Sequence, residues 1–256
     1  MKKPSTVQSL WGLQFAALLV LSAWAAVDPL FLPMIDTAQG WLTSPDAGYH
    51  HWTRTLGNIR PIALLCVLSI AFASMTCILG GMLLQSSVPK NSSTLRSVSA
   101  WLTLTATFAL WCSLVVHVEA IAWQGKRFRI AAQVDSMERI AGQLRESFPT
   151  QDGELPHLGP FMAYPFGQPS TLILLQSPPV NNHSRRNQSL YISAVERTAS
   201  GAILLQLSGT DGGDWAEWHP PASRPQSFIG GLGDRHNLDS CYSIGRGWYL
   251  VRYSNT

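Results

Sequence analysis

The sequence lacks charged residues over two long stretches of its first half. No charged residue lies in 61–89 or in 97–118. By contrast, residues 126–256 contain 12 of the 18 lysines and arginines and 11 of the 15 aspartates and glutamates. A charged side chain is unfavourable in hydrocarbon and ordinary on a water-exposed surface, so the two halves predict different environments. We expect a membrane domain over 1–124 and a soluble part after it.

Cysteine is scarce outside the apolar stretches. Cys66, Cys77 and Cys112 lie within them, where cysteine behaves as a small apolar residue, and only Cys241 lies beyond. One cysteine cannot form an internal disulfide framework, which excludes a disulfide-rich secreted module and fits a reducing compartment or a bacterial periplasm. The net charge of +3 comes without a long basic run or an aromatic-plus-basic pattern, so we expect no nucleic-acid partner.

The sequence also lacks spacings by which common active sites are recognised. It contains no Gly-x-Ser-x-Gly elbow, no His-x-x-x-His pair, no paired cysteines and no calcium-loop spacing. We therefore assign no catalytic residue and no cofactor from the sequence. Whether the protein is an enzyme stays open, and a non-enzymatic protein is the leading interpretation.

Three hydrophobic segments predict three membrane helices, with the lipid bilayer as their partner. They run over about 8–27, 61–85 and 100–122. The second contains eleven Leu, Ile, Val or Phe residues between Ile62 and Leu84, which favour insertion by about 3–6 kcal/mol. Each segment approaches or exceeds the roughly 20 residues that cross the hydrocarbon. The first follows Lys2 and Lys3 and contains an Ala-x-Ala, so it is either a membrane anchor, which we favour, or a signal peptide.

Two of these segments carry small or polar residues at every fourth position. Such residues let helix backbones approach closely in lipid. We expect the two faces to pack against each other, and they are also the surfaces that could bind another membrane protein or a second copy of the chain. The residues are Ser69, Ala73, Cys77 and Gly81 on the second segment and Thr105, Ala109, Ser113 and His117 on the third.

The basic residues predict which side of the membrane each part occupies. Lys2 and Lys3 precede the first segment and three aspartates follow it, which places the N-terminus in the cytoplasm and the C-terminal domain outside it. The count over all flanks is divided, with four basic residues for one side and five for the other. We follow the first segment because it usually dominates, and expect a bacterial inner (cytoplasmic) membrane. A cytoplasmic domain is the alternative.

An amphipathic stalk helix is predicted over 125–148. Its apolar residues recur at alternating spacings of four and three, the pattern of a helix with one buried stripe. We expect it to continue from the membrane and to pack on a sheet. Near its start, Lys126, Arg127 and Arg129 form an interfacial flank, or alternatively a site for anionic lipid headgroups. The stripe comprises Ile130, Val134, Met137, Ala141, Leu144 and Phe148.

Residues 149–256 have the composition of a β-rich soluble domain. Proline and glycine make up 21 of residues 151–256, so turns are frequent. Short apolar runs between them predict an antiparallel sheet of four to six strands with the stalk helix across one face. The predicted fold is thus a helical membrane half followed by a small α+β domain. The runs are 171–176, 190–195, 202–207 and 247–253, with a hairpin leading to 215–218.

The best candidates for a site in this domain are one carboxylate and two imidazoles. Glu217 and His219 are two residues apart, so alternate strand positions would place them on one face, and His236 follows in a neighbouring loop. Metal sites and enzymes use such groups, although ordinary surface turns are the commoner origin of the pattern. The neighbouring loops add Asp211, Asp214 and Asp239.

Three other features have a plainer interpretation. The run from Phe228 to Gly233 looks superficially like a glycine loop, but its spacing predicts a tight turn. Cys241 could form a nucleophile dyad with a histidine, but we expect a half-buried strand cysteine. The pair His50 and His51 could sense pH or bind a metal, but no partner residue accompanies it.

Three functions remain open. The first is a non-enzymatic envelope protein with an extracytoplasmic domain that presents a binding or assembly surface. The second is a membrane-tethered sensor or complex subunit with its domain in the cytoplasm. The third is an envelope enzyme or metal-binding protein that uses Glu217, His219 and His236. The layout and the missing catalytic spacings favour the first.

Overall fold

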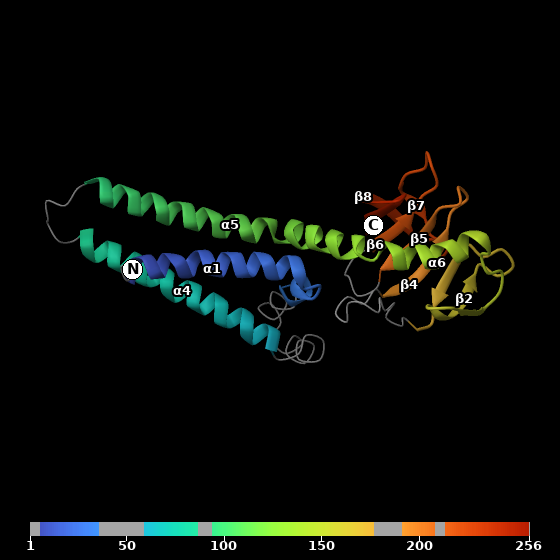
Figure 1. The fold of residues 1–256 in the computed structure, drawn as a ribbon, viewed down its shortest axis with the longest axis horizontal. Coiled ribbons are helices and arrows are strands. Elements are labelled where there is room, and N and C mark those ends of the chain that lie inside the picture. Colours follow the sequence, from blue (N-terminus) through green and yellow to red (C-terminus); the bar gives the residue numbers. More distant parts are fainter. Residues whose placement is uncertain (1–5, 36–58, 87–93, 177–190, 208–212, 256) are drawn as a thin grey trace. The chain divides into compact units, whose positions relative to one another are not determined.

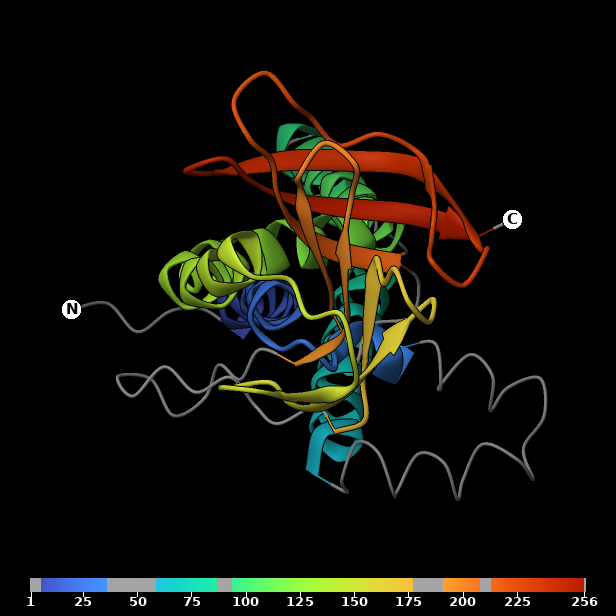
Figure 2. The ribbon, with the colours of Figure 1, turned by 90° about the vertical axis from the view of Figure 1, so that its right-hand side faces the viewer.

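The computed structural model describes residues 6–35, 59–86, 94–176, 191–207 and 213–255. They form two compact units, Met1–Lys126 and Arg127–Thr256, each with its own apolar core. The first unit is helical and the second is built around a sheet (Figure 1 and Figure 2). The predicted division into a helical half and a sheet domain is therefore confirmed.

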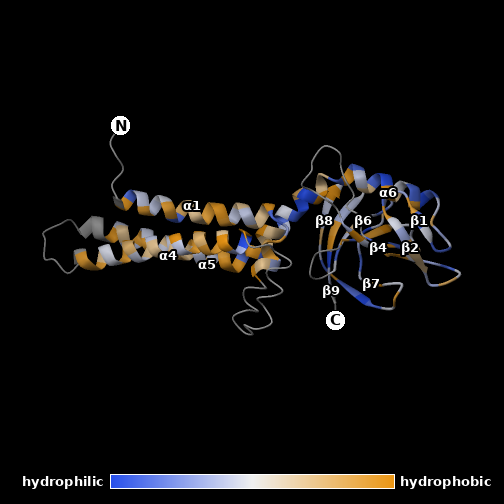
Figure 3. Ribbon diagram, turned by 90° about the horizontal axis from the view of Figure 1, so that it is seen from below, coloured by the Kyte–Doolittle hydropathy of each residue, from blue (hydrophilic) through white to orange (hydrophobic). Residues whose placement is uncertain are grey.

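The first unit contains the three apolar helices that the sequence predicts. They are α1 (Thr6–Val27), α4 (Ile59–Ser86) and α5 (Thr94–Ala131). Each includes a stretch that is long and apolar enough to cross a membrane, which identifies the chain as a membrane protein by length and composition. Figure 3 shows all three coloured mainly as hydrophobic over these stretches.

A buried glutamine joins these helices. Gln14 of α1 is completely buried, and its side-chain amide donates to the Ala71 carbonyl oxygen and to the Ser74 hydroxyl of α4, both at 2.6 Å. Its oxygen accepts a 2.9 Å bond from the indole nitrogen of Trp111 on α5. An unpaired amide is unfavourable in hydrocarbon, so these bonds help to set which helix faces meet. No spacing rule predicts such a junction from a lone glutamine.

The small-residue faces of α4 and α5 do not pack against each other, contrary to our expectation. All eight residues are exposed within the unit. The bonds from Gln14 reach a different face of α4, at Ala71 and Ser74. The exposed residues are Ser69, Ala73, Cys77 and Gly81 of α4 and Thr105, Ala109, Ser113 and His117 of α5. The buried residues of α4 include Leu64, Ala71, Ser74 and Ile78.

An ion pair joins the end of α1 to the start of α4. Arg60 donates to the Asp28 carboxylate at 2.8 Å, and the Trp24 indole donates to the same oxygen at 3.0 Å. Burial alone would raise the pKa of Asp28, but these hydrogen bonds outweigh it and hold that pKa below its usual value. The cluster of Leu21, Ala25, Phe31, Met34 and Leu64 packs at this end of the helices.

The second unit starts on the last turn of α5 and continues into α6 (Val134–Glu146). The prediction of one continuous helix over 125–148 is wrong, because α5 ends at Ala131 and the chain turns at 132–133. Neither residue of that turn is glycine or proline, so no local signal marks the break. The predicted stripe is confirmed within α6, where Val134, Met137, Ala141 and Leu144 are buried.

The described residues after α6 include one antiparallel sheet of nine strands, more than the four to six predicted. The predicted runs correspond to five of them. Of the missed strands, β1 and β7 are short, β2 begins Gly-Pro, and the longest, β8, begins Arg-His-Asn-Leu-Asp-Ser, which hydrophobicity does not reveal. The strands are β1 (Gly153–Leu155), β2 (Gly159–Tyr164), β3 (Thr171–Leu174), β4 (Ile192–Arg197), β5 (Ile203–Leu207), β6 (Gly213–Trp218), β7 (Phe228–Ile229), β8 (Arg235–Gly245) and β9 (Trp248–Asn255).

Strand order departs from sequence order at one place. Strands β1 to β6 pair in succession, but β6 then pairs with β9, and β8 and β7 follow outward. The segment 219–227 therefore leaves the sheet after β6 and re-enters it at the edge as β7. In Figure 2, β8 and β9 are the long red strands beside the shorter ones.

The pairing registers divide the strand side chains between two faces. On the helix face, Leu205, Ala216 and Leu250 share one row. Helix α6 covers this face, since the Trp248 indole donates to Glu138 at 2.8 Å. The opposite face, which we call the site face, carries Ala202, Leu204, Trp215, Val251 and Tyr253, with Phe228 of β7 packed against them.

Candidate functional site

Two of the predicted site residues meet at the end of β6. Glu217 lies on the site face, and His219 follows the last residue of the strand. The Nε2 atom of His219 lies 2.8 Å from Oε2 of Glu217, and both side chains are buried. Residues two apart in an extended chain point to the same side, which explains the contact.

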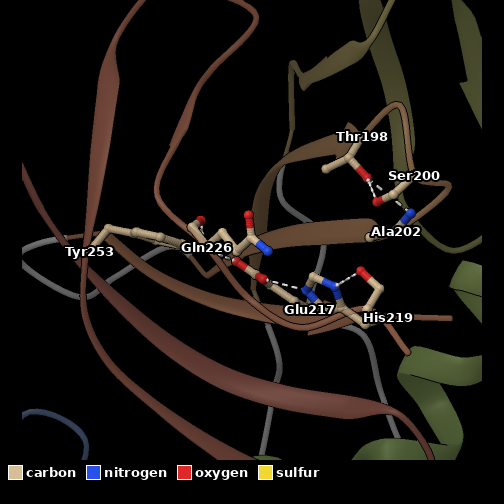
Figure 4. Close-up of polar contacts among 8 residues, drawn as sticks. Thr198, Ser200, Ala202, Glu217, His219, Gln226 and Tyr253 are labelled. Atoms are coloured by element: carbon tan, nitrogen blue, oxygen red, sulfur yellow. Dashed lines mark hydrogen bonds and ion pairs between the residues drawn. The ribbon is translucent and has the colours of Figure 1, made fainter. Parts of the chain in front are cut away.

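This pair belongs to a longer chain of hydrogen bonds (Figure 4). Tyr253 of β9 donates its hydroxyl to Oε1 of Glu217 at 2.6 Å and lies 3.2 Å from the carbonyl oxygen of Gln226. On the other side, Nδ1 of His219 lies 3.1 Å from the hydroxyl oxygen of Ser223. Burial and the neighbouring Glu217 carboxylate raise the pKa of Tyr253, so its phenol stays protonated and donates. We call the side chains of Tyr253, Glu217, His219 and Ser223 the relay.

The third predicted residue, His236, does not join the relay. It lies on β8, with Nε2 at 2.6 Å from Oδ2 of Asp234. Its ring stacks on Phe228 with 4.7 Å between ring centres and meets Trp215 edge-on. Within the part of the chain that the structure describes, no three histidine, cysteine or carboxylate side chains are placed to hold a metal ion. The predicted trio therefore forms no common ligand set.

A second polar cluster surrounds the backbone of Gly230. Glu196 of β4, Asp234 and His236 approach it so closely that a side chain would not fit. A β-carbon on Gly230 would lie 2.6 Å from Oδ1 of Asp234 and 3.1 Å from both Oε1 of Glu196 and Nε2 of His236. We call these three side chains the acid cluster.

The tight turn predicted near Gly233 is confirmed, and it lies over this cluster. The Gly230 N–H donates to the Asp234 carbonyl at 2.8 Å, and the Gly233 N–H donates to the Gly230 carbonyl at 2.9 Å. A β-carbon on Gly231 would lie only 2.0 Å from the Thr171 hydroxyl oxygen, so the backbone rests directly on β3. We call residues 230–234 the glycine strap.

Glu196 is an unusual acid within the cluster. Its residue is only 8 % exposed, and its Oε1 accepts a 3.3 Å bond from the Gly231 N–H. Burial raises the pKa of Glu196 to about 7, and the Asp234 carboxylate adds to the rise against the opposing hydrogen bond. Sequence reasoning missed this residue because a single carboxylate in a strand normally faces water.

The sheet register explains why two carboxylates share one core. Glu196 pairs with Leu204, and Leu204 pairs with Glu217, so the acids lie in one row with a single residue between them. Strands are about 4.8 Å apart, which puts their Cα atoms roughly 10 Å apart. At that separation in a buried setting, the Glu217 carboxylate adds to the rise in the pKa of Glu196.

The remaining candidates lie elsewhere. Asp214 is buried and pairs with Arg252 at 3.0 Å. Cys241 is exposed on β8 and is not the half-buried residue that we expected, and Asp239 on the same strand is also exposed. Asp211, His50 and His51 lie outside the described residues.

The relay can act in two ways. With hydrogen on Nε2, His219 donates to Glu217 and accepts from Ser223, which is the serine–histidine–carboxylate order that activates nucleophiles. The same bonds also hold the segment 219–227 on the sheet, because Ser223 and Gln226 both belong to it. The sequence did not reveal Tyr253 or Ser223, since no spacing relates position 253 to 217.

Comparison with known proteins gives no match, whether to a family model, to a curated protein or to a solved structure. Function is therefore inferred from the geometry of the two units.

Proposed function

We propose that this chain is a non-enzymatic protein of a bacterial inner membrane whose C-terminal domain lies outside the cytoplasm and binds a partner protein. Three helices supply the anchor. The lysines before α1 and the aspartates after it support a cytoplasmic N-terminus, and three crossings then leave the domain on the other side.

One observation carries the binding proposal, namely the exposed apolar side chains of the β2–β3 hairpin. The pairing registers place Met162, Tyr164 and Ile173 on the site face, in the same rows as Ala194 and Glu196 of β4. Exposed apolar groups gathered in one place are typical of protein interaction sites. We call the most exposed residues the hairpin surface: Met162 (49 %), Tyr164 (43 %), Phe166 (100 %) and Leu175 (58 %).

The hairpin surface lies next to the part of the site face that the glycine strap covers. Tyr164 is in register with Thr171, and Thr171 is buried under Gly231 of the glycine strap. The strap therefore covers the site face as far as Thr171 of β3, whereas Met162 and Tyr164 of β2 are exposed within the part of the chain that the structure describes. A partner with a complementary apolar surface would complete the cover.

The two polar clusters support a structural role over a catalytic one. Glu217, His219 and Tyr253 are buried and bond to one another, which is how polar groups in a core are normally satisfied. Glu217 is completely buried, so a substrate could reach its carboxylate only if part of the domain moved.

The test is site-specific photo-crosslinking in native membranes. A benzophenone amino acid at position 162 of the full chain should give a discrete protein adduct. An adduct of twice the chain mass means self-assembly, and another mass means a different partner, and either result supports the proposal. The same group at Asp239, which is also exposed, is the matched control and should give no adduct.

A second variant tests whether the adduct depends on partner binding at the hairpin surface and not merely on the reactivity of the crosslinking group. Tyr164→Asp places a charge beside position 162 at a residue that is itself exposed, so it should abolish the adduct while near-UV circular dichroism shows that the domain stays folded. If position 162 gives no protein adduct, or if position 239 gives the same one, the hairpin surface is not a docking surface.

A second candidate function, an envelope hydrolase, is favoured by the order Ser223, His219 and Glu217 in the relay. Ala222, just before the serine, has φ of 70°, a strained conformation that is commoner at functional sites. A fluorophosphonate probe decides between the two functions. Labelling that Ser223→Ala removes and Ser227→Ala keeps would establish the hydrolase, and no labelling of the full chain would exclude it.

The cytoplasmic sensor or subunit is the remaining alternative. Lys126, Arg127 and Arg129 follow the apolar part of α5, and basic residues favour the cytoplasmic side. This alternative shares the hairpin surface with our proposal and differs only in orientation, so a topology measurement separates them.

A further inference from the structure

The glycine strap is held in place by polar contacts and by no apolar anchor of its own. Leu232 in the strap is 62 % exposed, and Ile229 just before it is 67 % exposed. The contacts that hold it down are the 3.3 Å bond from the Gly231 N–H to Glu196 and the 2.6 Å pair of Asp234 with His236. A segment without buried apolar side chains belongs to the low-stability part of a fold, where local opening is easiest.

Among the described residues, four ionisable groups from the neighbouring elements face Glu196. Asp234 lies in the strap and His236 on β8, while Glu217 and Tyr253 come from β6 and β9. Of these four, only His236 can carry a positive charge, and Asp234 already pairs with it. Glu196 therefore has no cation of its own among them.

This arrangement suits Glu196 as a neutral acid and not as a carboxylate. Ionising it would add a negative charge near the Asp234 carboxylate, on a residue that is only 8 % exposed. A buried charge without a counter-ion is strongly unfavourable, and water is the simplest remedy. Water reaches Glu196 once the strap lifts.

We propose that the glycine strap is a proton-operated cover, which stays closed while Glu196 is protonated and opens when Glu196 becomes a carboxylate. Opening uncovers Thr171 and Glu196, which continue the row that begins at Tyr164. Among the residues that the structure describes, the exposed part of the site face would then extend from β2 to β4. Three glycines in the strap, one of them at φ of 87°, leave the backbone free to move.

The biological meaning of this device rests on the proposed function. A domain outside the cytoplasm experiences the pH of the surroundings, so the area available to a partner would grow from acid toward neutral and alkaline conditions. The pH-dependent opening of the glycine strap needs no partner, so it can be tested on this chain alone.

The experiment is hydrogen exchange by mass spectrometry on the full chain in lipid nanodiscs at pH 5 and pH 8. After correction for the intrinsic exchange rate, the peptide over 228–236 should open at least about tenfold more often at pH 8, since opening restores an ordinary acid. In Glu196→Gln, which cannot ionise, the two pH values should give the same opening. Glu154→Gln, an exposed carboxamide on β1, should behave like the unaltered chain.

Two outcomes would overturn the proposal. Opening that is independent of pH in the unaltered chain would show that Glu196 does not control the strap. A pH dependence that persists in Glu196→Gln would assign it to another group, with His236 first in line. Failure of the crosslink at position 162 with normal strap opening would reject the binding function alone.

Discussion

The hydroxyl of Tyr253 on β9 donates a 2.6 Å hydrogen bond to the carboxylate of Glu217 on β6, and both side chains are at most 2 % exposed. The two strands pair directly although β7 and β8 lie between them in sequence. The bond therefore links the two strands, β6 and β9, at which strand order departs from sequence order. It also gives a buried carboxylate one of its two side-chain partners, the other being His219.

Removing that hydroxyl should destabilise the C-terminal domain. Tyr253→Phe keeps the ring and leaves one oxygen of a buried carboxylate without its donor, so we expect a loss of about 1.5–3 kcal/mol in unfolding free energy. Urea unfolding of the full chain in detergent, followed by near-UV circular dichroism, measures it. Tyr191→Phe, at an exposed tyrosine, should change stability by less than about 0.5 kcal/mol.

Glu196 should make the stability of the domain depend on pH. Its pKa is about 7 in the folded domain, above the ordinary 4.5 that the unfolded chain should have. The stabilisation is therefore fully present below pH 4.5 and is lost as pH rises through 7, by up to about 3 kcal/mol in all.

Glu196→Gln isolates this contribution. The difference in unfolding free energy between the unaltered chain and the variant should fall steadily from pH 4.5 to 7 and then level off. Two curves that stay parallel over that range would contradict the assignment, because the remaining titrating groups are the same in both chains.

Gln14 should stabilise the helical unit inside the membrane. Gln14→Leu removes its bonds to Ala71, Ser74 and Trp111, and we expect a loss of about 0.5–2 kcal/mol, the usual range for polar contacts between membrane helices. Titration with SDS in mixed micelles measures it. Thr105→Val is the control, because that hydroxyl is exposed and bonds only back to its own helix, so no measurable change is expected.

Two glycines should respond in opposite directions to alanine. Gly142 lies inside α6, and a β-carbon there would meet only the end of the Arg145 side chain, at 3.7 Å, so Gly142→Ala should stabilise the domain by about 0.5–1 kcal/mol. Gly231→Ala would force a β-carbon to 2.0 Å from the Thr171 hydroxyl and should destabilise it by about 1–3 kcal/mol. Thermal unfolding of both variants provides the comparison, and a neutral Gly231→Ala would mean that the strap does not rest on Thr171.

The features that could be predicted from the sequence are those set by local composition or spacing. The absence of charged residues over 61–89 predicts a membrane helix independently of the rest of the fold. The contact of Glu217 with His219 follows from their spacing in an extended chain. The stripe of α6 follows from helical periodicity.

The features that could not be predicted depend on pairing between distant segments. Strand β8 is polar and exists because it pairs with β9. Glu196 becomes a buried acid because the register places it in the same row as Glu217 and beneath the strap. The exposed small-residue faces likewise depend on which residues Gln14 reaches on α4.

The central claim, an anchored domain outside the cytoplasm, is tested most directly at Thr256. Alkaline phosphatase and, separately, a fluorescent protein that matures only in the cytoplasm are fused after that residue in a bacterial host. We predict active phosphatase and a dark fluorescent fusion. A fluorescent fusion with inactive phosphatase would contradict the account, place Cys241 and the hairpin surface in the cytoplasm, and make the sensor or subunit function the better one.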